Sequence, residues 1–309
     1  MIAYALRRTG LGAGSAARPG TRPGAGTALR LGLAGVWLLD AALQYQPFMF
    51  TRAFGKALAT TAMGNAAVVS DPILWSASQV EQNAVLSNAV FATIQLLLAA
   101  GIAWPRTARI GLAASAVWSL AVWWLGEGFG GMLAGMASPL NGAPGAAILY
   151  ALLAVLLWPS ERPAQQAPFT AAGAVGVRAA RSLWSACWLI LASAALWPGN
   201  RAPQALALQI LDAGDGEPAW LAALDRHAAV FTATLGLAAP LTLALVLAVI
   251  AVAVWLPAPA AKAGLVLAIA TAGLIWVLGE SFGAILTGQA TDPNTGPLLA
   301  LLALAYWPG

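Results

Sequence analysis

The sequence predicts an all-α integral membrane protein with eight transmembrane helices, arranged as two parallel four-helix repeats with short interfacial helices on the outer side. The composition is the first reason, because 60% of the 309 residues are hydrophobic and only 8% are charged, against about 25% charged residues in soluble domains. The second reason is a series of apolar runs near the roughly 20 residues that cross a bilayer. The third is a motif that recurs 153 residues further along the chain.

Residues 1–29 form a segment of their own, in which Arg residues are scattered among Gly, Ala and Pro. No apolar stretch in this segment is long enough for the core of a signal peptide. We therefore expect a disordered cytoplasmic tail.

Eight apolar runs follow the tail in two sets of four. The first repeat, residues 30–160, is predicted to contain helices at 31–47, 84–104, 108–127 and 144–158. After a cytoplasmic linker at 161–179, the second repeat, residues 180–309, is predicted to contain helices at 180–197, 226–256, 262–280 and 297–307.

The outer segments at 48–83 and 198–225 are too long for turns and too apolar for plain linkers. Phe48-Met49-Phe50 and the stretch around Trp220 suggest short helices that lie on the membrane surface or cap the bundle. Such helices would form a lid over a site or a docking surface, and the sequence does not separate these two roles.

The distribution of basic residues predicts the orientation. Of the 15 Lys and Arg residues, only Arg52, Lys56, Arg201 and Arg226 fall outside if the N-terminus is cytoplasmic, as the positive-inside rule requires. All four helices predicted to run inward end in Trp followed closely by Pro, which is typical of a membrane interface. We expect both termini to be cytoplasmic. The preference for Arg over Lys and the abundance of Ala indicate a GC-rich bacterial genome, and hence a bacterial plasma membrane.

The self-match between the halves is the most informative feature of the sequence. Leu-Gly-Glu-Gly-Phe-Gly at 125–130 reappears as Leu-Gly-Glu-Ser-Phe-Gly at 278–283, and the match continues through Asn141/Asn294 and Pro144/Pro297. Because each half has an even number of predicted spans, the halves share one orientation and are related by an axis along the membrane normal.

The four-helix unit resembles the DoxX/DoxD-like family of small bacterial membrane proteins, here present as a tandem duplication. The resemblance is carried by Arg30-Leu-Gly-Leu33 and by Gln95-Leu-Leu-Leu-Ala-Ala-Gly-Ile-Ala-Trp-Pro-Arg106 with the Arg109-Ile-Gly-Leu that follows. The chain is also similar to uncharacterised integral membrane proteins of actinobacteria. The family resemblance implies a four-helix bundle and a role as a membrane subunit, and it carries over no catalytic residue.

Glu127 and Glu280 occupy equivalent positions at the outer ends of two predicted helices. A carboxylate near hydrocarbon is costly and often marks an ion or proton path, so two related glutamates are candidates for one central site. The alternative is that each carboxylate sits in the solvated headgroup region, where its charge costs little.

The last predicted helix of each half is too short to span the bilayer, so the polar stretch before it would lie at membrane depth. This predicts an outward-facing vestibule that contains Glu127, Asn141, Glu280, Asp292 and Asn294. Three further polar residues within helices, Asp40, Gln44 and Gln95, are candidate binding residues. Local thinning of the bilayer around a short helix is the alternative.

Glycines around the motif are interpreted as small-xxx-small contacts that let helix backbones approach closely in lipid. The residues assigned to this role are Gly126, Gly130, Gly131, Gly135, Gly279, Gly283 and Gly288.

Two functions follow from these features. The first is a transporter or channel-like protein with its site between the repeats; the alternative is a non-catalytic membrane subunit or assembly factor of a redox or envelope complex. An enzyme is not favoured, because no nucleophile or acid/base pair is recognisable. With one Cys and one His in the chain, no metal site or cofactor is predicted. The expected partners are the lipid bilayer and a membrane or periplasmic protein, and not a nucleic acid.

Overall fold

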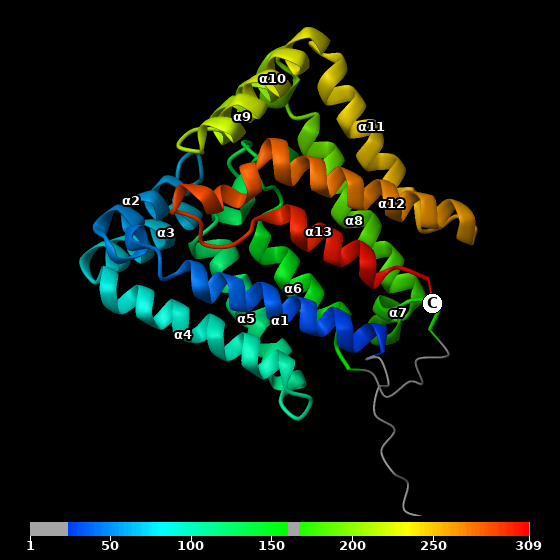
Figure 1. Ribbon diagram of the computed structural model, residues 1–309, viewed down its shortest axis with the longest axis horizontal. Helices are drawn as coiled ribbons and strands as arrows, with labels where there is room; N and C mark the ends of the chain where they lie inside the picture. The colour runs from blue at the N-terminus through cyan, green and yellow to red at the C-terminus, as the bar shows by residue number, and fades with distance from the viewer. Residues whose placement is uncertain (1–23, 160–166, 309) are drawn as a thin grey trace, which may run out of the picture.

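The computed structural model describes residues 24–159 and 167–308, and every regular element within these ranges is helical (Figure 1). The predicted tail therefore lies mostly outside the described residues. Its last part does not, since the first helix begins at Ala25 rather than at residue 31. The linker predicted at 161–179 is described only from residue 167, and there Thr170–Val175 is helical and buries Ala171 and Ala172.

The first half contains four longer helices, two outer helices and three 3₁₀ turns. In chain order these are α1 (Ala25–Leu43), η1 (Pro47–Phe50), α2 (Arg52–Thr60), α3 (Ala67–Gln82), α4 (Ala84–Ala103), α5 (Ala108–Leu125), η2 (Gly128–Gly131), η3 (Pro139–Asn141) and α6 (Ala146–Leu156).

The second half presents a closely similar series. After α7 (Thr170–Val175) come α8 (Val177–Ala195), η5 (Pro198–Arg201), α9 (Ala205–Ala213), α10 (Ala219–Leu235), α11 (Ala238–Ala253), α12 (Ala258–Leu274), a π turn η6 (Ile275–Gly279), η7 (Ser281–Thr287) and α13 (Thr295–Ala305). The outer segments of both halves are thus helical, as α2 and α3 in the first and as α9 and much of α10 in the second.

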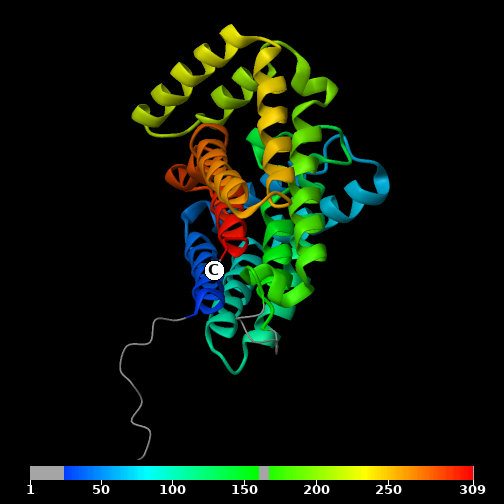
Figure 2. The same ribbon diagram turned by 90° about the vertical axis from the view of Figure 1, so that its right-hand side faces the viewer.

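Helices α12, α13, α1 and α4 lie side by side across the face seen in Figure 1, with α6 packed against α13 and α5. Helices α8 and α11 pair with each other, and α10 lies across their ends (Figure 2). The last helices of the two halves, α6 and α13, are therefore in contact at the centre.

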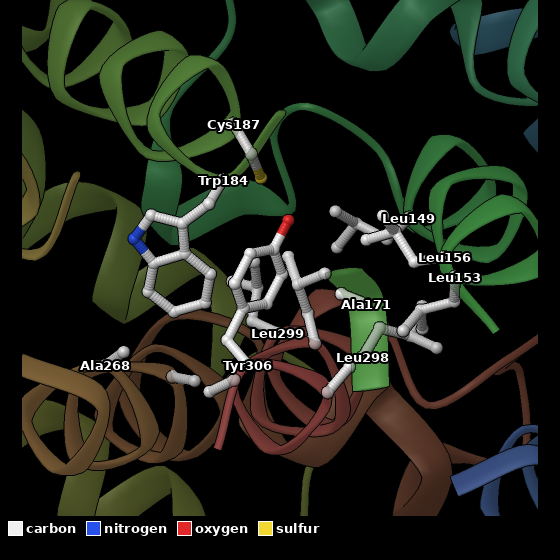
Figure 3. Close-up of a cluster of buried hydrophobic side chains, with 14 of the residues drawn as sticks. Leu149, Leu153, Leu156, Ala171, Trp184, Cys187, Ala268, Leu298, Leu299 and Tyr306 are labelled. Atoms are coloured by element: carbon white, nitrogen blue, oxygen red, sulfur yellow. The ribbon is translucent and has the colours of Figure 1, made fainter. Parts of the chain in front are cut away.

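The largest buried cluster lies between these central helices and α8. Figure 3 shows Leu149 and Leu153 of α6 near Leu298 and Leu299 of α13, with Trp184 of α8 beside them. Between helices in lipid, such side chains contribute through close van der Waals packing, because the lipid tails are as apolar as the side chains themselves. This cluster joins the two halves into one body.

Among the described residues, four helices are long and apolar enough to cross a membrane: α1, α4, α5 and α12 with its π turn. A fifth candidate is the pair formed by α10 and α11, and α6 and α13 are shorter apolar helices of 11 residues each. The described chain is thus a candidate multi-pass membrane protein whose apolar helices suggest contact with lipid.

The single continuous helix predicted at 226–256 is wrong, since α10 and α11 meet at 98°. Gly236 lies at the bend with φ 52° and ψ −129°, a conformation that is essentially restricted to glycine. Pro240 follows in the first turn of α11. Proline is tolerated there, because the backbone N–H that it lacks would have no partner within the helix. Hydropathy could not reveal the bend because both arms are apolar.

Candidate functional site

Glu127 stands two residues beyond the end of α5 and binds the start of α6. Its Oε1 accepts a hydrogen bond from the Ala147 amide at 2.9 Å, one of the amides that a helix start leaves without an internal partner. The indole of Trp123 donates to the Pro144 carbonyl at 2.7 Å, and Phe129 packs edge-on against Trp123 at 4.9 Å. These contacts fix α6 to the end of α5.

Glu280 makes the same kind of contact with α13. Its carboxylate accepts from the amides of Thr295 at 3.2 Å and Gly296 at 3.0 Å, and from the Thr295 hydroxyl. Trp276 donates to the Pro293 carbonyl at 2.9 Å, and Phe282 packs edge-on against Trp276 at 5.0 Å. Both glutamates therefore bind the N-terminus of the last helix of their half.

These contacts change the alignment of the two halves for the residues that follow the motif. The constant offset pairs Pro144 with Pro297, whereas the structure gives Pro293 the role of Pro144. The second loop is four residues shorter, and the matched spacing of Pro and Asn in it is therefore coincidental.

The interpretation as small-xxx-small helix contacts is wrong for the glycines that lie in turns. Gly126 and Gly279 end their helices, and the others lie in turns with φ between 62° and 76°: Gly130, Gly131, Gly135, Gly283 and Gly288. A Cβ on Gly130 would stand 2.3 Å from the Pro144 carbonyl oxygen, and one on Gly283 would stand 2.7 Å from that of Pro293. Positive φ and close approach to another backbone, rather than lipid-phase packing, explain these glycines.

A cavity of about 250 Å³ lies among the helices of the first half. Helices α1, α2, α4, α5 and α6 surround it, and Thr291 and Asp292 reach it from the loop before α13. Among its lining residues are the predicted candidates Asp40, Gln44, Gln95, Glu127 and Asp292. We call this space the inner cavity.

The deepest acid of the inner cavity is Asp40, which is 1% exposed. Its Oδ2 accepts a hydrogen bond from the Tyr150 hydroxyl at 2.5 Å, while its Oδ1 has no partner. Gln44 Oε1, Gln95 Oε1, Ser119 Oγ and Glu127 Oε2 are likewise buried without a partner. Buried polar atoms in native proteins are nearly always paired, so these atoms indicate a place for water or a ligand.

A second, more open space of about 460 Å³ adjoins the inner cavity, and we call it the vestibule. Thr60, Thr61 and the loops before α6 and α13 line it, including Asn141 and Asn294. Gly126, Glu127, Thr291 and Asp292 line both spaces. These four residues therefore form the boundary between the vestibule and the inner cavity.

Glu280 lines neither space, so the expectation of one central site shared by the two glutamates is wrong. At the corresponding place in the second half, Leu140 fills the room among Leu206, Ile210 and Ile275. A Cβ on Gly279 would lie 2.9 Å from the Leu140 Cα, whereas its counterpart Gly126 faces the inner cavity. The loop before α6 thus fills this space in the second half, whereas the corresponding space in the first half remains a cavity.

The helices of the second half also lack the polar residues with which the helices of the first half line the inner cavity. Trp37 and Trp188 are both fully buried, and Pro47 and Pro198 each begin a 3₁₀ turn, which aligns α1 with α8. This alignment pairs Asp40 with Leu191. The equivalent contacts of Trp123 and Trp276 pair Ser119 with Ala272, and those of Pro144 and Pro293 pair Tyr150 with Leu299. The second half has the framework of the first without its polar cavity.

Burial and nearby charge also raise the pKa values of the acids at the boundary. Removal from water, with repulsion from Asp292, raises the pKa of Glu127 to about 8. Burial raises the pKa of Asp292 as well. For Glu280 burial also dominates and the pKa rises to about 7, although the bonds from Thr295 and Gly296 oppose it. Glu127 therefore changes its charge near neutral pH.

Sequence reasoning missed Tyr150, Ser119 and the aromatic walls formed by Trp37 and Trp118. One available signal was Tyr150 itself, a lone polar residue within the apolar run 146–156. Trp37 was not identifiable, because it resembles any core aromatic until its indole is seen to donate to Ser115 at 3.0 Å.

The fold and the site define a helical protein with candidate membrane spans and a largely apolar cavity that is also lined by several buried polar side chains. Comparisons with protein-family models, curated proteins and solved structures give no match to this chain. Within the described residues, no group of three or more His, Cys, Asp or Glu side chains is placed to hold a metal ion.

Proposed function

We propose that this chain is a multi-pass membrane transporter or channel-like protein that takes a small solute from the vestibule into the inner cavity. The observation that carries the proposal is the shared boundary of the two spaces, at which Glu127, Thr291 and Asp292 face both. A route that passes from a more open space to an inner one lined by acidic side chains is typical of a solute pathway.

The proposal includes a tandem duplication with eight crossings. Its support is the repeated order of elements, with 19 residues in both α1 and α8, nine in both α2 and α9, and 11 in both α6 and α13. The equivalent contacts of Glu127 and Glu280 add to it. Gene duplication followed by loss of one cavity accounts for both the likeness and the difference between the halves.

The proposed location is a bacterial plasma membrane, with both termini cytoplasmic. The asymmetry of the Lys and Arg residues supports this orientation. It places α2, α3, α9 and the vestibule on the outer side, so the solute would enter from there.

The test is solute flux through the purified protein in liposomes, with protons, monovalent cations and small organic cations as probes. We expect flux above that of protein-free liposomes, and we expect Glu127→Gln to change its rate. The control is Asp212→Asn, because Asp212 is exposed on α9 away from both spaces. Absence of flux for every probe under any gradient would overturn the proposal.

A non-catalytic subunit of a redox or envelope complex, as in the DoxX/DoxD-like resemblance, is the second candidate. Large apolar side chains on the outer helices favour it, since Trp75 of α3 is 64% exposed and Trp220 of α10 is 60% exposed, and such residues are enriched in interfaces. Co-purification of a stoichiometric membrane or periplasmic partner, together with absence of flux, would support this function.

A further inference from the structure

We propose that the inner cavity binds a small primary ammonium cation, whose N–H groups donate to the carboxylates of Asp40 and Glu127 while its apolar body packs on the aromatic walls. This inference deepens the proposed function, on which it rests for the route by which the ligand enters. It names a ligand class that the location of the cavity alone does not give.

The charge of the lining is the first argument. Asp40, Glu127 and Asp292 all face the inner cavity, and the described residues that line it include no Lys, Arg or His. Asp292 interacts electrostatically with both Asp40 and Glu127. An anionic ligand would add to this repulsion, whereas a cation relieves it.

The unpaired oxygens give the second argument. Asp40 Oδ1 and Glu127 Oε2 are buried and accept no hydrogen bond within the protein. A ligand that binds the ionised form of these groups must donate, because an ionised carboxylate can only accept. The carboxamides of Gln44 and Gln95, 2% and 8% exposed, can turn either an oxygen or a nitrogen toward the ligand and adapt to its polar end.

The apolar walls give the third argument and separate an organic ammonium from a bare ion. Trp37, Trp118, Phe54 and Phe91 line the cavity together with Tyr150. Aromatic faces attract a cation through the quadrupole of the ring, and their surfaces favour hydrocarbon over water. A volume of about 250 Å³ lies just below the usual range of ligand pockets, about 300–1,000 Å³, so the cavity suits a small ligand such as a short alkylammonium ion.

The second half shows that the framework does not itself require such a space. There the counterparts of Asp40 and Tyr150 are Leu191 and Leu299, both fully buried, and Leu140 occupies the room. Because an equivalent framework folds with a filled, apolar interior, the acids of the first half are not needed for packing. Their retention in a costly place indicates a binding role.

The experiment is isothermal titration calorimetry of the full chain in detergent, with n-propylammonium chloride as the probe and 1-propanol as the uncharged analogue. We expect saturable binding of propylammonium and none of propanol. Asp40→Asn keeps an oxygen for the Tyr150 hydroxyl and removes the charge, so it should fold and bind propylammonium at least about tenfold more weakly. Glu127→Gln should do the same, and Asp212→Asn, on the exposed face of α9, should bind like the wild type.

Three results would overturn the inference: no saturable binding of propylammonium to folded wild-type protein, equally tight binding of propanol, or unchanged affinity in Asp40→Asn. Binding in detergent does not depend on flux in liposomes, so the two proposals fail separately. Propylammonium binding without flux removes the transport function and keeps the ammonium site. Flux of other solutes without propylammonium binding removes the ammonium site and keeps the transport function.

Discussion

Glu127 and Glu280 have the same neighbours in sequence but different tasks. Both oxygens of Glu280 accept hydrogen bonds from the start of α13. Glu127 uses Oε1 for the Ala147 amide and leaves Oε2 buried without a partner. One glutamate is therefore fully occupied in holding a helix, and the other has an oxygen left for a ligand.

This difference predicts unequal effects of the same substitution. Glu280→Gln replaces one accepting oxygen with an NH₂ group that faces N–H donors, and we expect it to lower the free energy of unfolding by about 1–3 kcal/mol. Glu127→Gln can keep its bond to Ala147 and turn the nitrogen toward the cavity, so its loss should stay below about 1 kcal/mol. Chemical unfolding in detergent, followed by far-UV circular dichroism, measures both; equal losses would contradict the assignment of the two roles.

The raised pKa of Glu127 predicts a pH dependence of ammonium binding. Below about pH 8 the unliganded carboxyl group holds a proton that a cation must displace, so affinity should increase as pH rises from about 6 to 8 and then level off. The groups that face it are Asp40, Tyr150 and Asp292, and propylammonium, like a lysine side chain, keeps its charge below about pH 10. Titration calorimetry at several pH values measures the slope; in Glu127→Gln the slope should be smaller, and an affinity that falls between about pH 6 and 8 would contradict the prediction.

At the scale of elements, the sequence predicted most helices because apolar length is a direct signal, as for α4 at 84–103 against the expected 84–104. It failed where the signal is conformational rather than apolar, as at Gly236. It also could not predict the exchange of loops between the halves. The sequence around Ser138 and Leu140 predicted only a polar turn. In the structure Leu140 packs into an apolar cluster of the second half, and the Ser138 hydroxyl donates a hydrogen bond to Gln209 of α9. Contacts between residues so distant in sequence produce no periodic pattern from which they could be predicted.

The bend between α10 and α11 gives a prediction at this scale. Gly236→Ala places a Cβ on a backbone with φ 52° and ψ −129°, which should lower stability by about 1–3 kcal/mol. Gly273→Ala is the matched control, because Gly273 lies inside α12 and a Cβ added there would enter open space, so alanine should be neutral or slightly stabilising. Thermal unfolding in detergent compares the two variants; a Gly236→Ala protein that melts like the wild type would show that the bend does not depend on glycine.

At the scale of the whole molecule, the sequence identified the right residues for part of the site and placed them wrongly. Asp40, Gln44, Gln95 and Glu127 do converge on one cavity, because polar residues in apolar helices tend to face one another. The cavity lies among the helices of the first half, and Asp292 reaches it from the second half. Symmetry in the sequence suggested a symmetric site, whereas Leu191 and Leu299 leave the corresponding positions of the second half without polar groups.

The parallel relation of the halves is itself testable through the chain's single cysteine, Cys187, which is buried. In a Cys187→Ala background, single cysteines replace Lys56 on α2, Asp212 on α9 and Arg106 after α4, all exposed. Parallel repeats with α4 crossing the membrane place Lys56→Cys and Asp212→Cys on the outer side and Arg106→Cys on the inner side. A membrane-impermeant maleimide should then label the first two in intact cells and the third only after permeabilisation. Labelling of Asp212→Cys from the same side as Arg106→Cys would instead require halves of opposite orientation, and labelling of all three in intact cells would show that α4 does not cross.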